Sequence, residues 1–158
     1  MQFRLARVDD ASAACKVVRR SIAELCEPDH GNDAQFLGHW LANKTPENVA
    51  TWITDPGNVV YVAVSDGIIT GIASMTRAGA VTLNYVSPDA RFKGISKALL
   101  MQLEHTAAEL GLAQCTLAST KTARRFYKSA GYREQQGVDS GWGCPMVKEI
   151  VPSGPTTR

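Results

Sequence analysis

The sequence predicts a mixed α/β fold, with a mostly antiparallel sheet and one parallel β–α–β step. Three β-rich segments at residues 59–64, 68–75 and 80–86 are separated by Ser-Asp-Gly and Arg-Ala-Gly, which is typical of antiparallel hairpins. An amphipathic helix at about 95–110 then leads to a short apolar strand at 112–118. Two strands joined by a helical crossover run parallel when they are neighbours in one sheet. We therefore expect the strands at 80–86 and 112–118 to be parallel.

The first third of the chain is expected to hold one strand and three helices. Residues 2–8 alternate like a strand, and apolar residues recur at helical spacing over 11–26. Further helices are expected near 34–43 and near 46–54, where a proline suits the first helical turn. Residues 27–33, Glu-Pro-Asp-His-Gly-Asn-Asp, have the composition of a turn.

The last third is expected to complete the sheet. One face of the helix at 95–110 is apolar, at residues Ile95, Leu99, Leu103, Ala107 and Leu110. Gly111 suits the end of this helix, because glycine adopts the left-handed conformation found there. The segments that follow are expected to be one helix, two closing strands and the loop between them, at residues 120–130, 132–136, 145–150 and 137–143.

Length and composition favour one globular domain. The chain has 158 residues, of which 44% are hydrophobic and 20% charged, and we expect a single domain over 1–151 with a flexible tail at 152–158. No apolar run approaches the ~18 residues of a membrane-spanning helix. The amino-terminal residues lack the apolar stretch of a signal peptide. A cytoplasmic protein without a membrane partner is therefore expected.

Charge, cysteine and histidine usage exclude several classes of function. With 17 basic and 15 acidic residues, the net charge of +2 is too small for a general nucleic-acid binder. The four cysteines and three histidines are scattered, without the paired spacing of a zinc site. We expect no metal and no disulfide, and four reduced thiols that are mostly buried. These are Cys15, Cys26, Cys115 and Cys144.

A basic cluster at the start of the helix at 95–110 predicts a phosphate site. Arg91, Lys93 and Lys97 crowd this helix start, and no acidic residue occurs between Ala90 and Leu103. The free N–H groups of a helix start already favour anions, so added cations are unfavourable there unless an anion binds. Gly94 allows a phosphate to approach the backbone closely. The alternative is a solvated basic face that contains a glycine by chance.

Two motifs in this region resemble those of the GNAT superfamily of N-acetyltransferases. Residues 91–96, Arg-Phe-Lys-Gly-Ile-Ser, resemble the pyrophosphate-binding signature [QR]-x-x-G-x-[GA], and Val-Ser-Pro precedes them at 86–88. Residues 123–132 resemble a second motif, A-x-x-F-Y-x-x-x-G-[FY]. Met146 and Lys148 fit the closing M-x-K strand, so the resemblance covers essentially 2–151. Neither a Walker loop nor a dinucleotide-binding glycine motif is present.

The resemblance implies a GNAT fold and an acetyl-CoA site. The strands at 80–86 and 112–118 would splay apart, and acetyl-CoA would enter the gap, pairing with the backbone of Tyr85 and Val86. Two residues depart from the family pattern: Ser96 replaces a usual Gly or Ala, and Thr120 replaces a frequent Asn that contacts the pantetheine arm. The residues implied to bind the coenzyme are Tyr85, Val86, Arg91, Phe92, Lys93, Gly94, Ile95, Ser96, Lys97, Thr120 and Phe126.

The resemblance also implies direct acetyl transfer to an amine, with Tyr127 as the general acid. A tyrosine with an ordinary pKa near ~10 stays protonated at neutral pH and can protonate a departing thiolate. The alternative for Tyr127 is a core aromatic packed beside Phe126. Candidates for the general base are Glu24, Asp29 and His30, each of which could equally be a solvated surface group, with a water chain acting instead.

Other side chains near the predicted site have two interpretations each. Trp40, Trp52 and Trp142 could line the acceptor pocket or simply pack. Arg124, Arg125 and Lys128 could approach the adenosine 3′-phosphate or face solvent. Cys115, in a buried strand, is rejected as a nucleophile. His105 is expected to face solvent.

We therefore predict an acetyl-CoA-dependent N-acetyltransferase. The acceptor is a small-molecule amine or a peptide or protein amine, and the resemblance implies that the chain can form a homodimer. The main alternative is a non-catalytic acyl-CoA-binding module with the same fold. A third hypothesis is nucleic-acid binding through the basic cluster.

Overall fold

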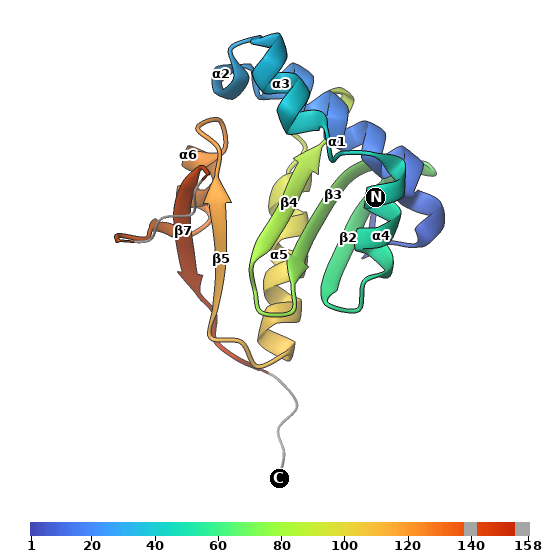
Figure 1. The fold of residues 1–158 in the computed structure, drawn as a ribbon. Coiled ribbons are helices and arrows are strands. Elements are labelled where there is room, and N and C mark those ends of the chain that lie inside the picture. The colour runs from blue at the N-terminus through green and yellow to red at the C-terminus, as the bar shows by residue number, and fades with distance from the viewer. Residues whose placement is uncertain (138–141, 154–158) are drawn as a thin grey trace.

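In a computed structural model of the chain, which describes residues 1–137 and 142–153, two antiparallel sheets lie side by side (Figure 1). The first sheet has the strand order β1-β2-β3-β4, with β1 Gln2–Leu5, β2 Asn58–Ser65, β3 Ile68–Thr76 and β4 Val81–Val86. The second has the order β5-β7-β6, with β5 Gln114–Ser119, β6 Arg133–Glu134 and β7 Cys144–Glu149. The predicted mixed α/β class with mostly antiparallel pairing is confirmed.

Helices cover both faces of the first sheet. Helix α5, Ile95–Glu109, packs on one face over a core that includes Ala73, Met75 and Met146. Helices α1, Ala11–Leu25, and α4, Pro46–Thr54, cover the other face. The shorter elements are η1 Val8–Asp10, α2 Glu27–His30, α3 Ala34–Leu41, η2 Pro88–Ala90 and α6 Arg124–Ser129. None of the described helices is long and apolar enough to cross a membrane.

The apolar stripes predicted for the two long helices are buried. In α1, Ala14, Val18 and Ile22 have no measurable exposure, and in α5 the same is true of Leu99 and Leu103. The stripe of α5 ends earlier than predicted, because Leu110 caps the helix and is 40% exposed. Gly111 follows with φ +80°, as the sequence predicts for a helix end.

Two predictions of local structure are corrected. Residues 27–33 are not purely a turn, because Glu27–His30 form the one-turn helix α2. The last helix begins at Arg124 rather than at 120, since the Thr120 hydroxyl accepts the N–H of Ala123 at 3.1 Å and holds that segment in a turn. Within the predicted tail, Ser153 donates its N–H to Ala108 O at 2.8 Å, and residues 154–158 lie outside the described residues. Residues 138–141 of the predicted loop also lie outside them.

Strands β4 and β5 are parallel, as predicted, but they meet only at their start. Among the described residues, their sole pairing is the bridge between Ala80 and Thr116, and the strands then diverge (Figure 1). Gly79 permits the close approach there, because a Cβ would lie 2.7 Å from Gln114 O. Beyond the bridge, Thr82 forms a β-bulge: Ser74 pairs with Leu83 and Met75 with Val81. A bulge bends its strand, so β4 turns away from β5.

Candidate active site between the splayed strands

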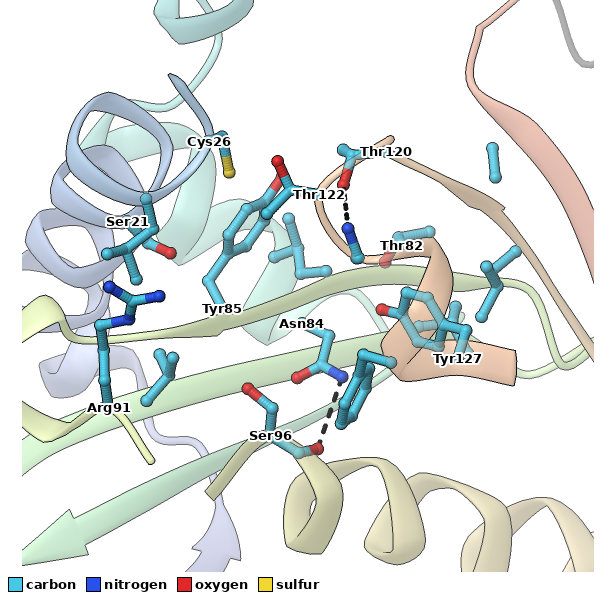
Figure 2. Close-up of a pocket in the computed structure, with 18 of the residues that line it drawn as sticks. Ser21, Cys26, Thr82, Asn84, Tyr85, Arg91, Ser96, Thr120, Thr122 and Tyr127 are labelled. Carbon is cyan, nitrogen blue, oxygen red and sulfur yellow. Dashed lines mark hydrogen bonds between the residues drawn. The ribbon is translucent and has the colours of Figure 1, made fainter. Parts of the chain in front are cut away.

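A pocket of about 440 Å³ occupies the space between β4 and β5 (Figure 2). From the predicted set, Tyr85 and Val86 line it from β4, and Arg91, Phe92 and Ser96 line it from the segment that enters α5. Thr120, Phe126 and Tyr127 line the opposite side. The structure therefore brings eight of the twelve predicted site residues to one pocket.

The other four predicted residues lie at the helix start but do not line the pocket. Lys93 and Lys97 are exposed, and the side chain of Ile95 is buried in the core, so only its backbone can serve a ligand. Gly94 has φ +74° and forms the turn into α5, where its conformation favours glycine.

The start of α5 is arranged to accept an anion. No side chain caps the helix, its first turn holds no acidic residue, and its first backbone bond runs from Ala98 N to Gly94 O. The N–H groups of residues 95–97 consequently have no partner within the helix. Before this turn, Phe92 has φ +64° and is 92% exposed, with the Arg91 guanidinium 4.5 Å from its ring centre.

Tyr127 presents a protonated hydroxyl to the pocket. The residue is 7% exposed, and its ring packs edge-on against Phe126 and Tyr132, with centres 5.1 and 5.7 Å away. Burial raises the pKa of the hydroxyl to about 12, while hydrogen bonding to Asn84 acts in the opposite direction. The packing expected of a core aromatic is thus present, and the hydroxyl at the pocket stays protonated at neutral pH.

Asn84 is a pocket residue that the sequence analysis missed. It lies in the middle of β4, and its Nδ2 donates to Ser96 O of α5 at 3.4 Å (Figure 2). Its Oδ1 is buried without a hydrogen-bond partner within the structure. Such an oxygen is costly unless a ligand or water donates to it. The signal in the sequence was an asparagine in a β-rich strand, directly before Tyr85.

These features fit acetyl-CoA. Outside the bridge at Ala80, the outer edge of β4 is unpaired among the described residues, so its backbone can pair with an extended ligand. The start of α5 and Arg91 offer positive potential to a pyrophosphate. The partnerless oxygen of Asn84 accepts one further donor.

Comparisons with known proteins agree with this geometry. Residues 26–149 match the acetyltransferase (GNAT) domain. This chain belongs to the GNAT family of acetyltransferases. It is 27% identical over 133 residues to uncharacterized N-acetyltransferases of Mycobacterium bovis and Mycobacterium tuberculosis, covering 78% of this chain and 83% of theirs. The predicted enzyme class, an N-acetyltransferase, is confirmed.

Solved structures share the GNAT fold with this chain. A GCN5-related N-acetyltransferase from Rhodopseudomonas palustris has a TM-score of 0.82 at 22% identity, covering 94% of this chain and 95% of that one. The PaiA N-acetyltransferase of Thermoplasma acidophilum, in complex with coenzyme A, has a TM-score of 0.78 at 17% identity, covering 95% and 100%.

On the side away from β5, residues of α1 and the face of β4 toward α1 line the pocket of this GNAT domain, and α3 packs behind them. Tyr85 faces α1 and lies near Cys26 and Trp40, and burial raises its pKa well above the usual value. Trp142 lines the pocket and packs edge-on against Trp40, with ring centres 5.6 Å apart. Phe36 packs against the other side of Trp40 at 6.2 Å. Two of the three predicted tryptophans thus contribute here, one directly and one behind it.

The three candidate bases have structural roles. His30 is not a surface group: it is 3% exposed, its Nδ1 accepts from Asn32 N at 3.0 Å, and its Nε2 lies 3.0 Å from Ile22 O. Both ring nitrogens are therefore occupied. Asp29 binds the segment after β5, with Lys121 N 2.6 Å from its Oδ1. Glu24 is paired with Arg20 at 2.9 Å.

The structure also shows the surroundings of the other side chains that the sequence analysis singled out, of which Arg125 is exposed. Arg124 and Lys128 both face Glu134, so α6 is tied to β6. Burial raises the pKa of the Cys115 thiol to about 11, which agrees with its rejection as a nucleophile. All four cysteines are free, and three of them are buried. His105 is 70% exposed beside Glu109, as expected.

Proposed function

We propose that this GNAT protein moves the acetyl group of acetyl-CoA directly to a primary amine, with Tyr127 as the general acid. The observation that carries the proposal is the buried, protonated Tyr127 hydroxyl in a pocket that opens between splayed parallel strands. A cytoplasmic location and a homodimer remain predictions.

The coenzyme end of the pocket is assigned to α5 and β4. Acetyl-CoA, when bound, supplies an activated acetyl thioester. The N–H groups of residues 95–97 and the Arg91 guanidinium would hold its pyrophosphate. Backbone groups of Tyr85 and Val86 would hold the pantetheine arm, and one N–H at this edge would polarise the thioester carbonyl. Ser96 and Thr120, the departures from the family motif, line the same pocket.

Proton transfer is assigned to Tyr127 and to solvent. The amine nitrogen attacks the thioester carbonyl carbon, so an N–C bond forms and the C–S bond breaks. Tyr127 gives its proton to the departing sulfur and is reprotonated from water. No Asp, Glu or His lines the pocket among the described residues, which supports removal of the amine proton by water rather than by a side-chain base.

The proposal is tested by measuring thiol release from acetyl-CoA with a panel of amines, together with the melting temperature with and without acetyl-CoA. We expect thermal stabilisation by acetyl-CoA and amine-dependent thiol release. Stabilisation without turnover on any amine would favour a non-catalytic acyl-CoA-binding module. If acetyl-CoA neither stabilised the protein nor released thiol, the proposed coenzyme site would be wrong.

A further inference from the structure

A second pocket adjoins the proposed active site on the acceptor side. It has a volume of about 300 Å³ and lies against the sheet face that α1 and α4 cover. Thr82 and Leu83 of β4 line both pockets, so the β-bulge at Thr82 forms their common border. Asn43, Lys44 and Trp52 close the second pocket from the α3–α4 side.

Among the residues that the structure describes, Lys44 is the only charged one that lines this second pocket. Its backbone is fixed, because Lys44 O accepts hydrogen bonds from Arg19 Nη1 at 2.8 Å and from Cys15 Sγ at 3.2 Å. Its Nζ donates to Asn43 Oδ1 at 2.7 Å. Lys44 is partly buried, and within residues 1–137 and 142–153 no carboxylate oxygen lies within 4.0 Å of its ammonium. Burial lowers the pKa of Lys44, as expected for a cation that lacks a balancing charge.

The charges that line the two pockets are all positive. Arg91 lies at the coenzyme end of the first pocket, and Lys44 lies in the second. No Asp or Glu lines either pocket among the described residues. A polycationic acceptor would find no carboxylate to bind in either pocket. An anionic group would instead form a charge-assisted hydrogen bond with Lys44 and so offset the cost of removing its ammonium from water.

We infer that the pocket at Lys44 binds a compact anionic group, a carboxylate or a phosphate, carried by the same molecule whose amine is acetylated. The inference rests on the proposed transfer to an amine and adds a substrate class to it. Lys44 would supply the charge, and Thr82, which lines both pockets, would separate the anion site from the site of transfer. Apolar contacts for the rest of the acceptor come from Trp52 and Leu83 on this side.

The test compares matched amines that differ only in the anionic group. Acetyl transfer is measured on an amino carboxylate, its carboxamide and the corresponding amino phosphate ester. The enzymes are wild type, Lys44→Met, Lys44→Arg and the control Lys16→Met, which changes an exposed lysine on α1. We expect Lys44→Met to raise KM for one anionic class at least tenfold, with KM for acetyl-CoA and transfer to the carboxamide unchanged. Lys44→Arg should retain most of the preference, and the anionic class affected identifies the group.

Equal KM values for carboxylate, phosphate and carboxamide in the wild type would overturn the inference and leave the proposed function intact. If no amine is acetylated, a direct binding measurement tests the anion site separately from the proposed acetyl transfer. Titration of the wild type with propionate and with inorganic phosphate, followed at the Lys44 side chain by NMR, should show saturable shifts that Lys16 does not show. Unchanged Lys44 signals would overturn the anion site, whatever the activity.

Discussion

Asp29 in α2 accepts the backbone N–H of Lys121 at 2.6 Å and so joins two segments that are 92 residues apart. The same carboxylate also binds the hydroxyl and the N–H of Thr122. Figure 1 shows α2 above the end of β5, where the two sheets are farthest from each other. Asp29 therefore holds the segment with Thr120, and the α6 helix that follows it, against the α1–α2 side of the pocket.

Replacing Asp29 should loosen this end of the site. Hydrogen bonds to a charged group are worth roughly 1.5–3 kcal/mol each. We expect Asp29→Ala to lower the melting temperature by a few °C and to raise KM for acetyl-CoA several-fold, because Thr120 loses its support. Asp29→Asn, which keeps one acceptor oxygen, should lose less. The control is Glu24→Ala on the neighbouring exposed surface, and equal kinetics for both alanine variants would contradict the assignment.

Tyr127→Phe should remove the general acid while leaving the ring packing intact. We expect kcat to fall by about 10²-fold or more, a usual value for a positioned proton donor, with little change in the dissociation constant for acetyl-CoA. Tyr61→Phe is the matched control, because it removes a hydroxyl that binds Thr106 Oγ1 on α5, away from the pocket. Steady-state kinetics and calorimetry make the comparison.

The pH dependence of turnover provides a second check on Tyr127. Its pKa is raised to about 12 by burial, so the acid form persists throughout the neutral and mildly alkaline range. Between pH 6 and 10 the rate should therefore rise, as an acceptor amine with a pKa of about 10 loses its proton, and it should show no fall within that range. A falling limb centred at or below pH 10 that disappears in Tyr127→Phe would show that the pKa is not raised.

The sequence predicted the elements well because strong local signals fixed them. The stripes of α1 and α5, the turns between β2, β3 and β4, and the glycines at 111 and 131 each act within a few residues. The short helix α2 was missed because tertiary contacts hold it, such as the contact of His30 with Ile22 O. The splaying of β4 and β5 came only from the family resemblance, since the bulge at Thr82 leaves no clear pattern in one sequence.

The candidate site was predicted in part for the same reason. Residues in contiguous motifs, such as Arg91, Ser96 and Tyr127, could be named because their spacing is local. Asn84 and Lys44 act through partners on other elements, and their roles depend on burial that a sequence does not show. None of the three base candidates lines the pocket, and the hydrogen bonds that hold them depend on other elements, which a sequence does not show.

Asn84→Leu should separate stability from function. The substitution removes a buried oxygen without a partner and fills similar space with an apolar group. Ser96 O and the Tyr127 hydroxyl lose the amide as a partner, which offsets the gain from removing the unpaired oxygen. We expect a melting temperature close to that of the wild type with at least a tenfold loss in kcat/KM. Asn84→Asp, which buries a charge beside Tyr127, should instead lower both. A fully active Asn84→Leu enzyme would show that the amide serves no ligand.

Gly94 tests whether the start of α5 binds pyrophosphate. A Cβ at Gly94 meets no atom within 4 Å, but φ is +74°, so any side chain costs about 1–2 kcal/mol of backbone strain. Gly94→Ala and Gly94→Asp share that cost, and only the second adds a carboxylate. We expect Gly94→Asp to weaken acetyl-CoA binding at least tenfold more than Gly94→Ala, as measured by calorimetry. Equal affinities of the two variants would place the phosphates elsewhere.

Far from the pocket, an ion pair ties β1 to the start of α1. Arg4 donates to both carboxylate oxygens of Asp10, at 2.8 and 3.0 Å, and Arg7 N donates to Asp10 Oδ2 at 2.7 Å. The Asp10 side chain is 12% exposed, so solvent screens the pair only partly. The hydrogen bond from Arg4 is the largest cause that lowers the pKa of Asp10 below its usual value.

This lowered pKa makes the protein less stable in acid, and the sign follows from linkage. A carboxyl whose folded pKa lies below its unfolded value stabilises the fold above the unfolded pKa, near 3.9, and loses that contribution as pH falls through the folded pKa. At pH 7, Asp10→Asn should lower the free energy of unfolding by about 1–3 kcal/mol. The difference from wild type should shrink toward zero as the pH is lowered to 2, in denaturant titrations. The exposed Asp9→Asn serves as the control, and a difference for Asp10→Asn that stays constant with pH would mean that packing, rather than the ion pair with Arg4, accounts for the loss.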